Sequence, residues 1–294
     1  MRPAFPRTRI ENVSVSRMLI GINWFFGYSH TSKAKDNLIV KYQTRERLAE
    51  TVSVFMKAGI DTLYGVRPEE PPLLLPAIKD AEQASGRKCI TVATPALNIA
   101  PGQAALDETA RILDDHARLG ATFCLPHQST TDALCDKRIR VIRDMDKYAK
   151  MIRERGMIPG LSTHMPETPI YADETGLDVA TYIQIYNAAG FLMQIEVDWV
   201  HRMIWGRKNP VIVIKPMAAG RLHPLVGLGF VWATLREQDM VCVGTLNGDE
   251  ARELIDISLS ILERRAPTGQ LQRTRSKESV EEKKGKLVDA AVSR

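Results

Sequence analysis

Residues 88–127, KCITVATPALNIAPGQAALDETARILDDHARLGATFCLPH, contain a complete strand–helix–strand unit and decide the fold. The segment 88–97 is apolar and ends in a polar loop, and the helical pattern of 107–120 closes at Gly120. Glycine is the residue that most often ends a helix, and the strand 121–127 begins immediately after it. A helix that crosses from one strand to the next predicts parallel pairing.

The same unit recurs along the whole body of the chain. Eight such units in about 245 residues are typical of a TIM barrel. We therefore predict an α/β fold, a single-domain (βα)8 barrel over residues 15–263. The predicted strands are 18–25, 61–66, 88–97, 121–127, 157–164, 177–187, 210–218 and 239–247. The predicted helices are 44–58, 71–86, 107–120, 137–156, 167–176, 191–206, 224–237 and 249–262.

The sixth strand has two candidates. Residues 177–187 alternate and are rich in β-forming side chains, which favours them as the strand. The alternative, residues 191–198, would bring Glu196 and Asp198 to the barrel mouth. We prefer the first, so that 191–206 becomes a helix with its apolar side chains in one stripe.

The net charge of +5 belongs to one end of the 294-residue chain. Nine of the 40 basic and four of the 35 acidic residues lie in 264–294, which leaves 31 of each sign in the remainder. The tail mixes both signs and has no aromatic side chain, so we predict a flexible end and no nucleic-acid partner. Residues 1–14 are predicted to be an N-terminal extension.

The sequence also bears on the compartment. No apolar run approaches the ~18–20 residues that cross a bilayer, and the first residues lack the apolar stretch of a signal peptide. The four cysteines have no metal-finger spacing, so we expect reduced thiols in a cytoplasmic protein without a membrane partner. Assembly into a homo-oligomer stays open.

Histidines mark the carboxyl ends of the strands, where TIM barrels place their active sites. Four of the six follow predicted strands, and His127 and His164 directly end neighbouring ones. Adjacent strands lie about 4.8 Å apart, and His30 reaches the same mouth from the first loop. We therefore predict a divalent metal site at His30, His127 and His164, with Asp36, Asp61 or Glu167 as the carboxylate ligand.

Other polar side chains lie near strand ends. Lys215 lies within VIVIKPMA, where burial would lower its pKa or let it orient an anionic group. Gln184 and Asn187 are neutral hydrogen-bonding groups suited to a sugar-like or amide ligand. Asp61 and Tyr64 belong to the second strand.

Seven segments resemble the aldo/keto reductases in order and spacing. They are RMLIGINWFFGYSH (17–30), AGIDTLYG (58–65), FCLPHQ (123–128), GLSTH (160–164), DVATYIQIYN (178–187), VIVIKPMAAGRL (211–222) and VCVGTLNGDEARELI (241–255). The resemblance implies a TIM barrel that binds NADP(H) in an extended pose. It also implies carbonyl reduction by an Asp, Tyr, Lys and His tetrad.

The resemblance assigns roles to individual residues. Asp61 and His127 match the tetrad aspartate and histidine, and Tyr64 is the candidate acid. The tetrad lysine has no counterpart, since strand three ends in TVATPAL (91–97). As cofactor-binding residues we assign Ser162, Gln184, Asn187, Gly244, Thr245 and Asn247. In the last unit Glu250 and Leu254 replace the usual Gln and Asn, and Arg252 is the candidate for a 2′-phosphate.

Three functions remain open. The preferred one is an enzyme that acts on a small polar carbonyl or polyhydroxy substrate by His- or metal-assisted acid–base chemistry, as a lyase, isomerase or hydrolase. Its catalytic residues would be Asp61, Tyr64, His127, His164 and Lys215. The alternative is an NAD(P)H-dependent oxidoreductase with Tyr64 or Tyr28 as proton donor. The third is a barrel that only binds a ligand or a partner.

Overall fold

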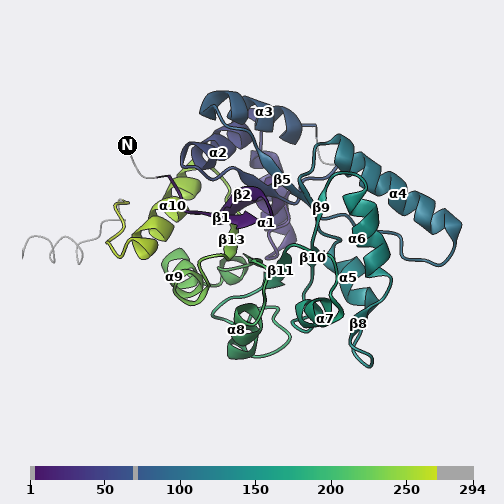
Figure 1. The fold of residues 1–294 in the computed structure, drawn as a ribbon. Coiled ribbons are helices and arrows are strands. Elements are labelled where there is room, and N and C mark those ends of the chain that lie inside the picture. Colours follow the sequence, from purple (N-terminus) through teal and green to yellow (C-terminus); the bar gives the residue numbers. More distant parts are fainter. Residues whose placement is uncertain (1–3, 69–71, 270–294) are drawn as a thin grey trace, which may run out of the picture.

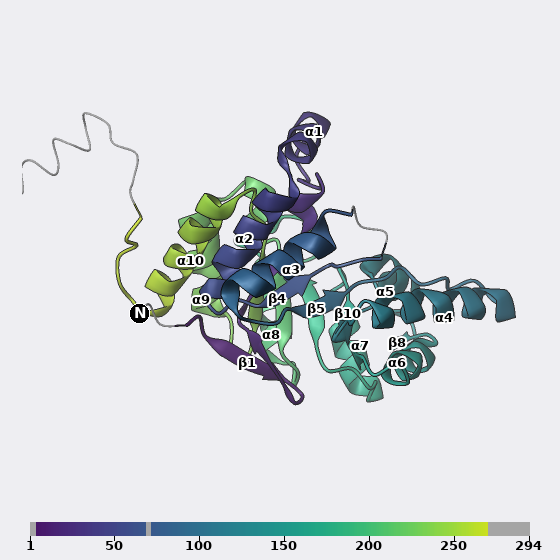
Figure 2. The ribbon, with the colours of Figure 1, turned by 90° about the horizontal axis from the view of Figure 1, so that it is seen from above.

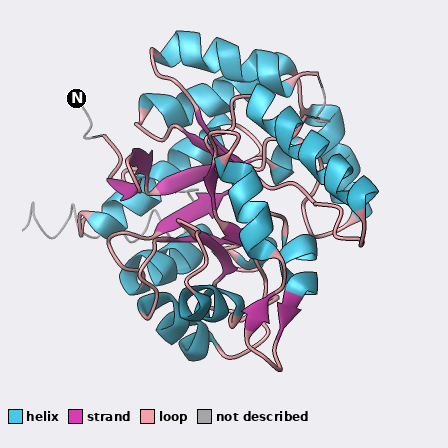
Figure 3. Ribbon diagram, turned by 45° about the vertical axis from the view of Figure 1, so that its right-hand side comes forward, coloured by secondary structure: helices cyan, strands magenta, loops and turns pink. Residues whose placement is uncertain are grey.

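The computed structural model describes residues 4–68 and 72–269, and it confirms the TIM barrel. Parallel strands occupy the centre and helices surround them (Figures 1 and 3). The barrel strands are β3 (Met18–Gly21), β4 (Thr62–Tyr64), β5 (Ile90–Ala93), β6 (Phe123–Cys124), β9 (Ile158–Pro159), β10 (Leu161–Ser162), β11 (Tyr182–Ile185), β12 (Val211–Ile214) and β13 (Met240–Val243).

The barrel closes through its fifth strand, which Gly160 divides into β9 and β10. β9 pairs with β6, and β10 pairs with β11, so the two ends of the strand order are consecutive in the chain. A Cβ atom at Gly160 would lie 2.6 Å from the carbonyl oxygen of Thr181 and 2.7 Å from Cγ of Leu125. The absence of a side chain at this position therefore lets two neighbouring strands approach closely enough to close the ring.

The outer helices follow the predicted order. Several have defined caps: the Thr44 side chain accepts from the backbone N–H of Arg47, and Gly86 and Gly176 end their helices in the left-handed conformation. The helices are α2 (Arg45–Lys57), α3 (Leu74–Ser85), α4 (Gln103–Arg118), α6 (Met145–Arg153), α7 (Thr168–Thr175), α8 (Val197–Trp205), α9 (Pro224–Thr234) and α10 (Gly248–Leu262).

Two insertions at the barrel mouth were not predicted as helices. The first loop contains α1 (Lys33–Tyr42), and the segment after β6 contains α5 (Gln128–Leu134). α1 stands away from the barrel on the side opposite to β1 (Figure 2). Both begin with a side-chain cap, from Ser32 and His127 respectively.

Two predicted helices begin later than expected. Residues 137–144 belong to the hairpin of β7 (Cys135–Asp136) and β8 (Val141–Ile142), where Arg138 and Arg143 bind Asp136. Residues 191–196 form a turn, because the Asn187 side chain donates a hydrogen bond to the carbonyl oxygen of Phe191 and accepts one from its N–H. The sixth strand lies within 177–187, as preferred, and the alternative at 191–198 is wrong.

The N-terminal residues close the other end of the barrel. β1 (Arg7–Ile10) and β2 (Val13–Ser16) form an antiparallel hairpin, so the predicted boundary at residue 15 falls inside β2. Ile10 and Val15 are fully buried in one cluster with Leu19 of the barrel interior. The extension therefore forms the floor of the barrel.

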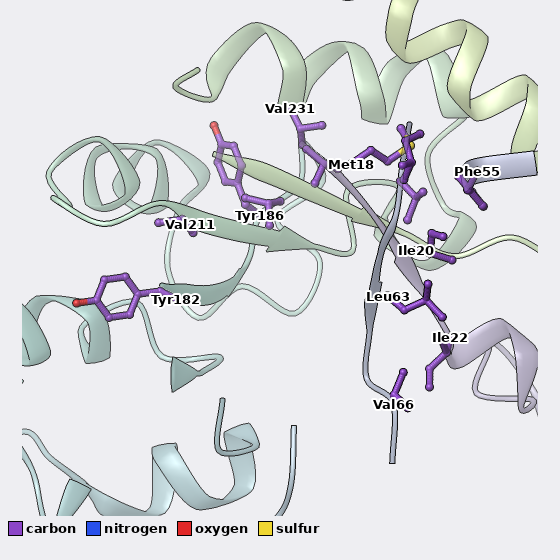
Figure 4. Packing of buried hydrophobic residues seen from close by; sticks show 14 of the residues in the cluster. Met18, Ile20, Ile22, Phe55, Leu63, Val66, Tyr182, Tyr186, Val211 and Val231 are labelled. Atoms are coloured by element: carbon purple, nitrogen blue, oxygen red, sulfur yellow. The ribbon is translucent and has the colours of Figure 1, made fainter. Parts of the chain in front are cut away.

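A second apolar layer lies between the strands and the helices. Figure 4 shows Met18, Ile20 and Leu63 on the strands beside Phe55 of α2, and all four are fully buried. This layer holds the helices against the barrel and leaves the strand ends at the mouth for polar side chains.

The remaining sequence-based expectations concern the tail, the cysteines and the membrane. Most of the predicted tail, residues 270–294, lies outside the described residues. All four cysteines are described and are free thiols. Within residues 4–68 and 72–269, no helix is long and apolar enough to span a membrane.

Candidate active site

A pocket of about 740 Å³ opens at the carboxyl ends of the strands. It extends from the ends of β4, β6 and β10 to the first turns of α10. Its polar lining consists of side chains from several different strand ends, as in other TIM-barrel active sites. These include Tyr64, Arg67, Thr94, His127, Ser162, His164, Lys215, Glu250 and Glu253.

His127 and His164 stand on neighbouring units of the barrel, as predicted. His127 caps α5, with its Nδ1 atom 2.8 Å from the Ser129 hydroxyl. The backbone N–H of His164 donates to Asp132 at 3.1 Å, and the Thr163 hydroxyl donates to the same carboxylate. The contact with Ser129 positions the His127 ring, and the contacts with Asp132 position the backbone that carries His164.

His30 and Lys215 form a pair at the opposite side of the mouth. The Lys215 ammonium lies 3.2 Å from Nε2 of His30, and Nδ1 of His30 lies 3.0 Å from the carbonyl oxygen of Tyr28. Lys215 and His30 both adopt left-handed backbone conformations, with φ of 57° and 59°. Burial lowers the pKa of Lys215.

The three histidines are biased toward the neutral form. Burial, followed by the positive charge of Lys215, lowers the pKa of His164 to about 4. Burial also lowers the pKa of His30 and of His127, and Lys215 and Arg67 respectively add to the effect. At neutral pH the imidazoles therefore act as uncharged hydrogen-bonding groups.

The structure does not support the predicted metal site. Within the part of the chain that the structure describes, no three His, Cys, Asp or Glu side chains converge as metal ligands. His30 faces the Lys215 ammonium, whose charge would repel a cation. None of the candidate carboxylates is available: Asp61 binds Arg7, Glu167 pairs with Lys137, and Asp36 accepts from Ser29.

Asp61 lies at the wrong end of the barrel for catalysis. It precedes the first residue of β4, and both carboxylate oxygens accept from Arg7 of the floor hairpin, at 2.9 and 3.0 Å. It does not line the pocket. The structure therefore does not support a catalytic role for Asp61, and the carboxylate stabilises the floor.

Tyr64, in contrast, points into the pocket. Its hydroxyl interacts with the side chains of Ser162 and Thr94, which line the same pocket. Burial raises the pKa of Tyr64 above its ordinary value, and the nearby Arg67 opposes this shift only weakly. The phenol is therefore protonated at physiological pH. The sequence analysis missed Arg67, although its place three residues after Tyr64 is a signal that it belongs to the same loop.

The predicted cofactor residues divide into two groups. Ser162 and Gly244 line the pocket. Gln184, Asn187, Thr245 and Asn247 do not: Asn187 shapes the turn at Phe191 and Asn247 caps α10. Gln184 and Thr245 are buried, and Oε1 of Gln184 and Oγ1 of Thr245 have no hydrogen-bond partner among the described residues.

The lowered histidine pKa values predict how stability depends on pH. An unfolded histidine has a pKa of about 6.5, so below that pH the unfolded chain binds protons that the folded chain excludes. The stability that comes from keeping these histidines neutral is fully present above about pH 6.5. It is lost as the pH falls toward their pKa values in the folded protein, about 4 for His164. The melting temperature should therefore fall between about pH 7 and pH 4. His164→Gln should reduce this dependence, and an unchanged slope would contradict the assignment.

Solved structures provide the comparison with known proteins, because no family model and no curated protein matches the chain. A Pseudomonas aeruginosa protein assigned to the aldo-keto reductases is 15% identical, with a TM-score of 0.62 over 89% of this chain and 98% of its own. The holo form of an aldo-keto reductase from Bacillus halodurans is 14% identical, with a TM-score of 0.53 over 91% and 99%.

The glycerol dehydrogenase of Gluconobacter oxydans is 12% identical, with a TM-score of 0.52 over 91% of this chain and 98% of its own. At such low identities the likeness concerns the fold. The chain has a TIM-barrel fold similar to that of these aldo-keto reductases.

Proposed function

We propose that the chain is an oxidoreductase that transfers a hydride from a nicotinamide dinucleotide to the carbonyl group of a small polar substrate. The observation that carries the proposal is one continuous pocket, which joins the polar strand ends around Tyr64 to Gly244 and the start of α10. A dinucleotide bound in an extended pose would need such a path. The solved structures of similar fold include a dehydrogenase and a holo-form reductase, which supports the proposal.

The residues around the pocket fit the cofactor. Gly244 leaves the wall open, since a Cβ atom there would lie 3.0 Å from the Trp24 ring. Ser162 lines the pocket and its hydroxyl is suited to the nicotinamide amide. When bound, the nicotinamide supplies the hydride.

Tyr64 and His164 are the proposed hydrogen-bond donors to the substrate carbonyl oxygen. A neutral imidazole N–H polarises a carbonyl without carrying charge, and the low pKa keeps His164 in that form. Tyr64 would give its proton to the carbonyl oxygen of the substrate, and solvent would restore it. The product is an alcohol.

Charge at the α10 end favours NADH over NADPH. Glu250 and Glu253 line the pocket there and would repel a 2′-phosphate. Arg252, the candidate for that phosphate, instead pairs with Asp249 and Glu50. The metal-assisted lyase, isomerase or hydrolase has no support from the histidine geometry.

Cofactor preference tests this proposal. With aldehyde and ketone substrates, we expect kcat/KM for NADH to exceed that for NADPH by about tenfold. This ratio corresponds to a free-energy difference of ~1.4 kcal/mol, which we assign to one unfavourable charge contact. Glu253→Lys should shift the preference toward NADPH. Glu263→Lys, at the far end of the same helix, is the control and should leave it unchanged. A wild-type preference for NADPH would overturn the charge argument, and no oxidation of either nucleotide would overturn the function.

A further inference from the structure

The pair of Lys215 and His30 is not used by the proposed hydride transfer. Lys215 follows β12 and His30 follows β3, so two separate strand ends bring the amine and the imidazole to 3.2 Å. Both residues line the pocket and are accessible from it. Left-handed backbone costs free energy in residues other than glycine, and it persists where the surrounding structure enforces it. Here the same strain occurs on both sides of one contact.

The surroundings of Lys215 differ from those of a structural lysine. Its polar partner is an imidazole, and no carboxylate among the described residues forms an ion pair with it. The titratable groups that interact with it are His30, His164 and Cys242, and the same pocket is lined by His127, Tyr64, Arg67, Glu250 and Glu253. Burial beside these neutral partners favours loss of the ammonium proton.

We infer that Lys215 is a nucleophile that forms an imine with a small aldehyde or ketone in the pocket, and that His30 accepts the proton the amine must lose. A deprotonated lysine beside a proton acceptor is the arrangement that imine formation requires. The acceptor is Nε2 of His30, because Nδ1 faces the carbonyl oxygen of Tyr28.

The chemistry balances without an added reagent. The free amine attacks the carbonyl carbon, and the carbonyl oxygen takes up the proton held by His30 to give a carbinolamine whose nitrogen carries two protons. His30 moves one of these protons from the nitrogen to the hydroxyl group, which leaves as water while the freed nitrogen lone pair forms the C=N bond. From ammonium and carbonyl, the net products are a protonated imine and one water, with nothing oxidised or reduced.

The protonated imine would open chemistry beyond carbonyl reduction. It acidifies the adjacent C–H bond, and the imidazole of His127 at the same mouth is the candidate to accept that proton. The inference requires no nucleotide and is independent of the proposed function. Its test therefore omits the cofactor, so that either idea can fail alone.

Reductive trapping tests the imine. The full chain is incubated with pyruvate or with glycolaldehyde and sodium cyanoborohydride, then digested, and the adducts are located by mass spectrometry. We expect the reduced adduct on Lys215 to form at least about tenfold faster than on Lys208, an exposed lysine just before β12 that serves as an internal control. The rate at Lys215 should also rise at a lower pH than the rate at Lys208.

Variants separate the nucleophile from its partner. Lys215→Arg and Lys215→Met should lose the pocket adduct while circular dichroism shows an intact fold. His30→Gln should slow trapping at Lys215 by about tenfold and shift its pH profile upward, with no effect at Lys208. The inference would be overturned if both probes modified Lys215 no faster than Lys208. It would also be overturned if the Lys215 variants formed as much adduct in the pocket as the wild-type protein.

Discussion

Replacing Tyr64 with phenylalanine is expected to lower kcat of NADH-dependent carbonyl reduction by about 10²–10⁴-fold, the usual effect of losing a positioned proton donor. The KM for NADH should change little, because the hydroxyl faces the substrate end of the pocket with Ser162 and Thr94. Steady-state kinetics with saturating NADH measures both constants.

Tyr28→Phe is the matched control. Tyr28 also lines the pocket and was the other candidate donor, but its side chain is 53% exposed at the rim. We expect near wild-type activity from this variant. A large loss in Tyr28→Phe together with an active Tyr64→Phe would reverse the assignment. The lost hydroxyl contacts of Tyr64 should cost only about 0.5–1.5 kcal/mol of stability, so both proteins should fold.

Asp239→Ala is expected to destabilise the barrel by about 3–5 kcal/mol, the cost of leaving buried charge without its partner. Asp239 is fully buried and accepts from Nε and Nη2 of Arg236 at 2.8 and 2.7 Å. It also accepts the backbone N–H of Val211 at 2.9 Å, which joins the starts of β12 and β13. Its removal leaves Nε of Arg236 and the N–H of Val211 without their acceptor, while Nη2 keeps only the carbonyl oxygen of Asn209.

Urea denaturation of the variant measures this effect. Asp249→Ala is the control, since Asp249 pairs with Arg252 but its side chain is 91% exposed. Exposed ion pairs contribute about 0–1 kcal/mol. A loss in Asp239→Ala no larger than in Asp249→Ala would show that the buried network is not what holds these strands together.

The barrel could be predicted because each strand and helix is specified by residues that are close together in the sequence. Each unit carries its own apolar strand and helical stripe, and glycines such as Gly120 and Gly156 mark where helices end. The hairpin of β7 and β8 could not be predicted. It depends on Arg138 and Arg143 binding Asp136, and these contacts form only after the chain has turned back.

The site was predicted in part for the same reason. His127, His164 and Lys215 follow strand ends that the pattern locates well, and the structure brings all three to one pocket. Asp61 was misplaced because its position depends on the residue at which β4 begins. A shift of a few residues moves a side chain from one end of a barrel to the other.

The metal prediction lacks support for a different reason. Proximity of His30, His127 and His164 to one mouth does not specify where their ring nitrogens point or what they face. The Lys215 ammonium beside His30 is a long-range contact, between residues 185 positions apart. Sequence spacing therefore predicted the histidines at the mouth but not the cation that makes a metal site unfavourable.

Equilibrium titration with NADH, followed by nucleotide fluorescence, tests the central claim most directly. The account predicts one saturable site with a dissociation constant in the range of about 1 μM–1 mM typical of enzyme ligands. Gly244→Val should abolish binding, because a side chain there would fill the wall beside Trp24. Gly229→Ala in α9, where a Cβ atom meets nothing within 4 Å, should bind like wild type. No fluorescence change over that range, or equal binding by Gly244→Val, would contradict a dinucleotide site in this pocket.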